Sequence, residues 1–425
     1  MFITDGGNNY RITVSKAPPM GRLTLRSFRE RIAAAFLLAM AVSHIAMALN
    51  VSHLLKNGYQ DFTIFYTAGR MVRSGQASTL YDPDAQYRTE KEFAPNVRIR
   101  QAALPYVHTP FEALLFVPFT FLGYVPAYVL WTALNIALIL LNLSLLRKHF
   151  TVVQALSPVL LVLAAAGFFP IAIGLIQGQD TILVLFSIVA SMILLKDGRD
   201  GLAGAALGLG LFKFHFVAPL ALIVAMRRPR LLAGFVPMAL GLGGLSILLV
   251  GIRGVVNYVH YVLHLERTGA GGAIMASDMP NLRGLIDTVM GLPTDTVGSM
   301  AMTLLCSIAV FWTAQARIRR GNESVLHLFA FATIAAILIS YHALPYDLVL
   351  LFPSALVLLA TEVSENTRMD RADAVLLALL FMTPLYVLLW LRLNQFAWFG
   401  VLLIWLLWRF GRPSAANESP LLEAT

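Results

Sequence analysis

Three ionisable residues of this 425-residue chain stand where they could take part in chemistry: Asp61, His108 and Lys213. Asp61 begins the stretch DFTIFYTAGRMVRSG, whose apolar residues recur at helical spacing and predict an amphipathic helix at a membrane surface. A carboxylate held in such a place can remove a proton from a hydroxyl group. Lys213 lies at the centre of the apolar segment 201–226. Burying an ionisable residue there is costly, so its presence indicates a function.

Two of these residues also have a structural explanation that the sequence leaves open. Asp61 occupies the N-cap position of its predicted helix, so its carboxylate could instead accept backbone N–H groups. Lys213 could extend its long side chain to the membrane interface and leave only its stem in the apolar region.

Acidic residues nearby in the chain are predicted to be structural. Asp82 is followed by a proline, the order expected of an N-cap and a first helical residue. Thr109 and Glu112 have the spacing of a capping box, in which each side chain binds the backbone of the other residue. His108, just before this box, is then free to face a polar cavity.

The amino-acid composition indicates whether water or lipid surrounds most of this chain. Hydrophobic residues make up 58% and charged residues 13%, with a mean hydropathy of +0.72, whereas an ordinary globular domain is about 25% charged. The net charge is +9, but the Lys and Arg residues are scattered between apolar runs, which excludes a nucleic-acid-binding face. Cys306 is the only cysteine, so neither an intramolecular disulfide nor a cysteine-based metal cluster can form. Lipid must therefore be the main solvent.

We expect an all-α polytopic membrane protein with a single transmembrane domain over residues 32–410. A bilayer needs roughly 20 apolar residues per helical span, and the apolar runs predict about ten full spans. They lie near residues 32–51, 125–146, 155–174, 180–195, 231–251, 297–316, 324–340, 346–361, 372–391 and 396–409.

The connections between these spans differ in charge. The short connections at 175–180 and 341–346 contain no Lys or Arg, whereas every connection on the opposite side is basic. The positive-inside rule then places the basic N-terminal segment 1–31, which precedes an uncleaved membrane anchor, and the disordered tail 411–425 in the cytoplasm. The outer connections 52–124 and 252–296 are long enough to be functional, and 52–124 is the expected catalytic loop. We expect a multi-pass protein of the cell inner (plasma) membrane with its active site on the periplasmic or extracellular side.

The segment 201–226 breaks this alternation because basic residues flank it at both ends. Each half contains only about a dozen residues, which is too few to cross a bilayer. We therefore predict a hairpin of two short helices with Lys213 to His215 near its turn.

The order and spacing of several short pieces carry a resemblance to a known family. The pieces are Asp61 to Arg70 (DFTIFYTAGR), Gly75, Tyr81-Asp82-Pro83, His108-Thr109-Pro110-Phe111, Trp131, Gly178-Gln179-Asp180, Ala203-Gly204 to Lys213, Asn281 to Gly284, and Tyr341 to Asp347. Together they resemble glycosyltransferase family 87 of the GT-C superfamily over nearly the whole chain. Lys213-Phe214-His215 departs from the Lys-Pro of many relatives.

The resemblance implies a GT-C-like fold and a hexosyltransferase. The enzyme would move a hexose, often mannose, from a polyprenyl-phosphate sugar donor to a lipid or glycan acceptor outside the cytoplasm. The first-loop aspartate of the family, matching Asp61, is the expected catalytic base. An outer histidine matching His342 is expected to line the same site.

Such a reaction agrees with the residues present. Displacement of a phosphate from an anomeric carbon with inversion needs a base on the acceptor hydroxyl, and cations should hold the leaving phosphate. Arg70, Lys213, Arg283 and His342 are the candidate cations, and His108 is a further candidate for binding substrate. Nucleotide-binding fingerprints are missing from the sequence, which suits a donor carried by lipid. We expect no cofactor, and no metal because the His residues lack a recurring ligand spacing.

Two other functions are compatible with a chain of many spans. A transporter or flippase would have inverted repeats and a site at the midplane, and the sequence shows no internal repeat. A lipid-linked glycan ligase or polymerase would place its functional residues in a large late outer loop, and the segment 252–296 keeps that alternative open.

Overall fold

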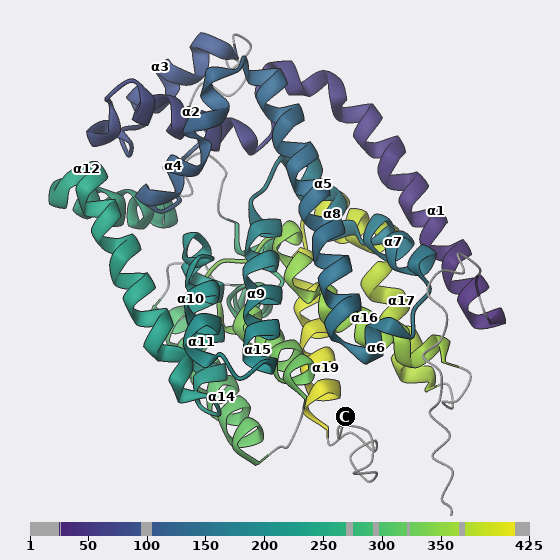
Figure 1. The fold of residues 1–425 in the computed structure, drawn as a ribbon. Coiled ribbons are helices and arrows are strands. Elements are labelled where there is room, and N and C mark those ends of the chain that lie inside the picture. Colours follow the sequence, from purple (N-terminus) through teal and green to yellow (C-terminus); the bar gives the residue numbers. More distant parts are fainter. Residues whose placement is uncertain are drawn as a thin grey trace, which may run out of the picture.

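A computed structural model describes residue 25 and residues 27–94, 104–268, 275–291, 297–320, 324–364 and 370–412. These residues form helices and no strands (Figure 1), as expected for an all-α protein. Most of the predicted basic N-terminal segment, and the predicted tail from residue 413 onward, lie outside the described residues.

The α-helices follow one another from the first long span to the C-terminal helix. They are α1 (Phe28–Val51), α2 (Phe62–Arg73), α3 (Pro83–Phe93), α4 (Ala113–Phe116), α5 (Tyr124–His149), α6 (Thr151–Gln154), α7 (Pro158–Gly167), α8 (Phe169–Gln177), α9 (Thr181–Lys196), α10 (Asp200–Gly208), α11 (Phe214–Ala225), α12 (Leu232–Thr268), α13 (Leu282–Met290), α14 (Val297–Arg320), α15 (Val325–Ile339), α16 (Phe352–Val363), α17 (Arg371–Phe381), α18 (Thr383–Val387) and α19 (Phe399–Gly411). Short 3-10 turns connect several of them, and those used below are η2 (Ala77–Thr79), η4 (Pro110–Glu112), η5 (Val117–Phe121), η6 (Leu211–Lys213) and η10 (Pro345–Leu351).

Among the described residues, five helical stretches are long and apolar enough to cross a membrane, or eight if each bent pair of helices counts as one span. The bent pairs are α7 with α8 (60°), α10 with the segment Leu211–Ala225 (68°), and α17 with the segment Thr383–Arg392 (59°). The expected number of about ten full spans is therefore not confirmed. Pro170 and Pro384 stand at the start of α8 and α18, where a proline cannot continue the preceding helix.

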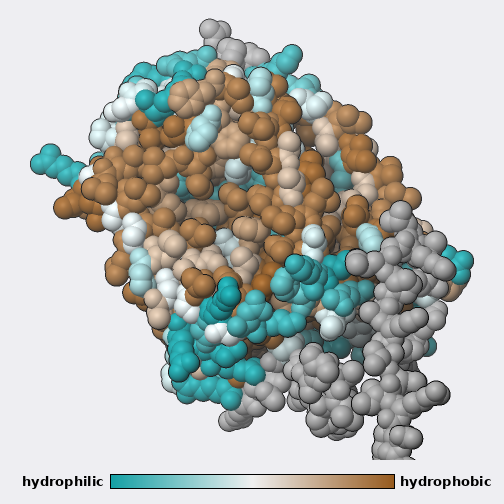
Figure 2. Space-filling model, viewed as in Figure 1, coloured by the Kyte–Doolittle hydropathy of each residue, from teal (hydrophilic) through white to brown (hydrophobic). Residues whose placement is uncertain are grey.

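The exposed surface separates into zones. Figure 2 shows a broad hydrophobic band across the molecule with hydrophilic surface at its two ends. At one end lie α2, α3 and α4, and the C-terminal end of α19 lies at the other (Figure 1). This arrangement fits a multi-pass membrane protein with the first outer connection gathered at one end.

Basic connections meet at the end opposite α2, α3 and α4. Lys196 Nζ donates a hydrogen bond of 2.5 Å to the carbonyl of His149, and Arg317 Nε donates one of 2.5 Å to the carbonyl of Gly411. Connections that are far apart in the sequence thus lie side by side.

The helix α2 differs from its prediction. We expected it to lie at the membrane surface, yet nine of its 12 residues are buried. It packs against α3, α4 and η5, and Gly69 permits the close approach because a Cβ there would come within 2.8 Å of the Phe116 backbone. Protein therefore covers α2 on several sides.

The predicted loop 252–296 starts as a continuation of α12. Gly251, with φ 71° and ψ 169°, kinks this helix, and glycine adopts such a conformation at no steric cost. The part of α12 after the kink packs against η2 and η4, which belong to the first outer connection. The two long outer connections are therefore in contact.

The segment 201–226 forms two short helices, as predicted, and Lys213 lies at the break between them. Their axes are bent by 68°, so they do not run back antiparallel as a hairpin would. The bend places Lys213 in the interior, with its side chain only 4% exposed.

Candidate active site

Lys213 is the centre of a buried network of charged and polar side chains. Its Nζ lies 2.8 Å from Asp347 Oδ1, 3.4 Å from Asp180 Oδ1 and 3.4 Å from Gln179 Oε1. A buried ammonium group needs such partners because desolvation is costly. The amine is therefore paired inside the protein and does not extend to the membrane interface.

The start of η10 holds Asp347 in place. Its Oδ1 accepts a hydrogen bond of 3.1 Å from Thr181 Oγ1, and its Oδ2 accepts one of 2.9 Å from the Leu344 backbone N–H. The Tyr346 ring lies 5.1 Å from Lys213 Nζ and adds a cation–π contact. Asp347 is therefore a fixed counter-ion for Lys213.

Asp61 joins this network through Gln179. Gln179 Nε2 donates a hydrogen bond of 2.6 Å to Asp61 Oδ2, and the Asp61 backbone N–H donates one of 3.2 Å to Gln177 Oε1. The Asp61 carboxylate makes no capping hydrogen bond to α2, so the N-cap explanation is wrong for this residue. For Asp82 it is correct, because its carboxylate accepts from the backbone of Asp84 and Ala85.

The turn between α8 and α9 positions Gln179 and Asp180. Gly178 has a φ of +67°, and a Cβ there would lie 2.7 Å from Phe62 Cβ. Trp131 Nε1 donates a hydrogen bond of 2.8 Å to the Gly178 carbonyl. Since only glycine fits this conformation and contact, the turn holds the two polar side chains against α2.

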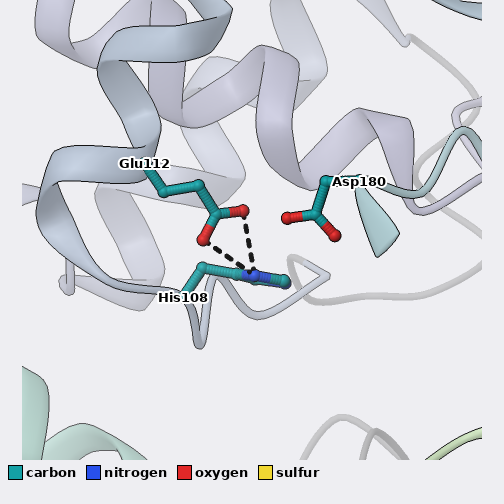
Figure 3. Close-up of side chains that lie close together, drawn as sticks. All are labelled: His108, Glu112 and Asp180. Atoms are coloured by element: carbon teal, nitrogen blue, oxygen red, sulfur yellow. Dashed lines mark hydrogen bonds and ion pairs between the residues drawn. The ribbon is translucent and has the colours of Figure 1, made fainter. Parts of the chain in front are cut away.

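A second group of side chains, His108, Glu112 and Asp180, adjoins this network (Figure 3). His108 Nδ1 lies 3.1 Å from Glu112, and one ligand atom from each residue lies within 4.8 Å of the others. The predicted capping box is wrong because the Thr109 side chain makes no capping hydrogen bond and Glu112 contacts His108 instead.

His108 and Glu112 lie in a poorly solvated position in the predicted connection 52–124. Burial raises the pKa of Glu112 to about 8. Burial lowers the pKa of His108 to about 4. In each case the cause is loss of water around the charged form.

The remaining predicted site residues lie elsewhere. Arg70 pairs with Glu92 at 2.5 Å on the surface. Arg283 donates a hydrogen bond of 3.2 Å to the Tyr341 carbonyl, and the His342 ring lies 6.0 Å from that of His215. The structure thus brings Asp61, His108 and Lys213 together, and the predicted roles of all six residues stay predictions.

An apolar cavity of about 710 Å³ lies beside the Lys213 network. Its walls come from α12, α13 and α14 and from residues next to the network, and include Phe214, Tyr258, Leu263, Arg283, Met300 and Tyr341. Tyr258 also hydrogen-bonds the Val107 carbonyl, directly before His108. The cavity therefore adjoins the site.

Bent membrane helices around a buried ionisable network define a polytopic membrane protein with an interior polar site. The sequence model of glycosyltransferase family 87 matches residues 106–345, which is more than half of the chain. The chain belongs to this family and is a membrane glycosyltransferase. No curated protein and no solved structure matches it. His108, Glu112, Asp180 and Lys213 lie inside the matched residues, and Asp61 and Asp347 lie outside them.

Proposed function

We propose that this glycosyltransferase transfers a hexose, mannose in the first instance, from a polyprenyl-phosphate sugar to a lipid or glycan acceptor. The observation that carries the proposal is the position of Asp61. Asp61 is a partly buried residue, and among the described residues its carboxylate accepts a side-chain hydrogen bond from Gln179 at Oδ2. Oδ1 is then available to an acceptor hydroxyl group.

The reaction needs one proton transfer and one displacement. Asp61 takes the proton of the acceptor hydroxyl, and the acceptor oxygen forms a bond to the anomeric carbon. The bond from that carbon to the phosphate oxygen breaks on the opposite face, and its electron pair leaves with the polyprenyl phosphate. The configuration at the anomeric carbon is inverted.

The cations divide into two roles in this proposal. A Lys ammonium has three N–H donors, and Lys213 has three oxygen neighbours within 3.4 Å. We therefore assign Lys213 to positioning Gln179, and through it Asp61. Arg283, in the wall of the apolar cavity, and His342, which follows Tyr341 of that wall, are the better placed groups for the phosphate.

The cavity supports a donor carried by lipid. It is mostly apolar and has Arg283 in its wall, a combination that suits an isoprenoid chain next to a phosphate. Two of its walls, α12 and α14, are candidate membrane spans, so a lipid could enter from the bilayer.

The proposal predicts that a panel of purified donors separates this enzyme from its alternatives. Purified protein in liposomes should transfer label from at least one radiolabelled polyprenyl-phosphate hexose to an acceptor lipid. It should not use nucleotide sugars. Transfer from diphosphate-linked glycans alone would contradict the proposal and support a ligase or polymerase.

We also propose that the site faces the periplasmic or extracellular side of the plasma membrane. In a Cys306→Ser background, a cysteine at Ser78 is expected to react with an impermeant maleimide in intact cells. A cysteine at Ser414 is expected to react only after the cells are opened. The reverse pattern would place the site in the cytoplasm and exclude the proposed topology.

A further inference from the structure

The buried carboxylates around Lys213 outnumber the cations paired with them. Asp180 and Asp347 share the single ammonium group of Lys213. Among the described residues, Glu112 forms its ion pair with His108, whose ring is charged only when protonated. Buried charges without partners are strongly destabilising, so this group needs either bound protons or a further cation.

Unpartnered oxygen atoms point into the space between the three side chains. Asp180 and Glu112 are both 0% exposed. With both carboxyl groups ionised, neither oxygen of Asp180 has a hydrogen-bond partner in the part of the chain that the structure describes, although Oδ1 lies 3.4 Å from Lys213 Nζ. A proton shared with the Glu112 carboxyl group would supply one. Figure 3 shows the Asp180 carboxylate facing the Glu112 carboxylate and the His108 ring. Buried oxygen atoms of this kind normally accept a hydrogen bond or bind an ion.

The donor set and its spacing fit a metal ion. Zn²⁺ binds imidazole nitrogen and carboxylate oxygen at about 2.0 to 2.2 Å, which places tetrahedral ligand atoms roughly 3.4 Å apart. His108 Nδ1 and the Glu112 oxygens lie 3.1 Å apart, and all three ligand atoms lie within 4.8 Å of one another. A small rotation of the Asp180 side chain would complete three protein ligands.

We propose that His108, Glu112 and Asp180 bind one divalent transition-metal ion, with Zn²⁺ as the best match to one imidazole and two carboxylates. Three protein ligands leave one coordination position of the metal open. Catalytic zinc sites have such an open position, whereas structural zinc sites do not. The proposal departs from the sequence expectation of no metal, which considered only ligand spacing along the chain. Asp180 comes from a different turn and is brought to the other two by the fold.

The surroundings hold the ligands in position. Tyr81 Oη donates a hydrogen bond of 2.8 Å to the His108 carbonyl. The His108 ring contacts the Phe65 ring edge to face, with centroids 4.8 Å apart. Such contacts around a ligand orient it toward the metal.

Metal binding can be tested by a titration that does not depend on enzymatic activity. Purified full-length protein is stripped with a chelator, returned to metal-free buffer and titrated with Zn²⁺ against a chromophoric chelator. We expect one Zn²⁺ per chain and a higher thermal midpoint of unfolding when it is bound. Glu112→Gln and Asp180→Asn should each weaken the binding at least about tenfold.

The matched control is Asp82→Asn, which alters a helix cap outside the cluster and should bind Zn²⁺ like the wild type. If Asp180→Asn does not accumulate, Glu112→Gln and His108→Gln provide the comparison. Absence of stoichiometric binding, or equal binding by wild type and every folded ligand variant, would overturn the proposal and leave the carboxylates neutralised by protons. The readout does not involve sugar transfer, so its failure leaves the proposed function untouched.

Discussion

Asp61→Asn is expected to lower the turnover number at least about a hundredfold, because general-base assistance is typically worth 10²- to 10⁴-fold. The asparagine can still accept the hydrogen bond from Gln179, but it cannot take a proton at neutral pH. Folding should be unchanged, since the carboxylate caps no helix. Initial rates with a radiolabelled polyprenyl-phosphate hexose measure the effect, and thermal unfolding of the same samples measures stability.

Asp82→Asn is the control for this experiment. Asp82 does cap a helix, and asparagine caps about as well as aspartate, so this variant should keep most of its activity. If Asp61→Asn retains more than about a tenth of the wild-type turnover, the loss is smaller than removal of a base allows. Asp61 would then not be the base.

Lys213→Met should destabilise the protein by about 3 to 5 kcal/mol, because it leaves the buried carboxylates of Asp180 and Asp347 without their cation. The thermal midpoint of the detergent-purified protein and its yield in the membrane measure the effect. Lys148→Met, on an exposed lysine, is the control and should change stability by less than about 0.5 kcal/mol.

A double variant separates loss of pairing from loss of volume. Lys213→Met combined with Asp347→Asn removes both charges of the closest pair, so it should be less destabilised than the sum of the two single variants. Strict additivity would mean that the two side chains do not interact, contrary to their 2.8 Å contact.

The sequence predicts where most helices lie, but not where a predicted span is bent or broken. Hydropathy depends on composition, so the apolar runs coincide with helices in the structure. The number of full spans was not predictable in the same way. Pro170 and Pro384 divide two runs into bent pairs, and a hydropathy window does not register such breaks. Three further runs form apolar helices of only 10–17 residues, namely Thr181–Lys196, Val325–Ile339 and Phe396–Gly411.

Only some residues of the candidate site could be predicted from the sequence. Asp61, His108 and Lys213 stood out because ionisable residues are rare in this chain, and the fold brings them together. Gln179, Asp180 and Asp347 were not assigned to the site, although a signal existed: they are the polar residues of short turns without Lys or Arg. Arg70 was assigned to it, but its partner Glu92 could be found only once α2 and α3 were placed.

The network around Lys213 also bears on how the protein is made. Its members come from segments that leave the ribosome at very different times, since Asp61 is near the start of the chain and Asp347 is near its end. Until η10 is inserted, Lys213 lacks its closest counter-ion and would be expensive to bury. Nascent chains that end before Asp347 would therefore hold α10 and α11 near the aqueous boundary or in a translocon. Competence for sugar transfer would arise only when the last third of the protein has entered the bilayer.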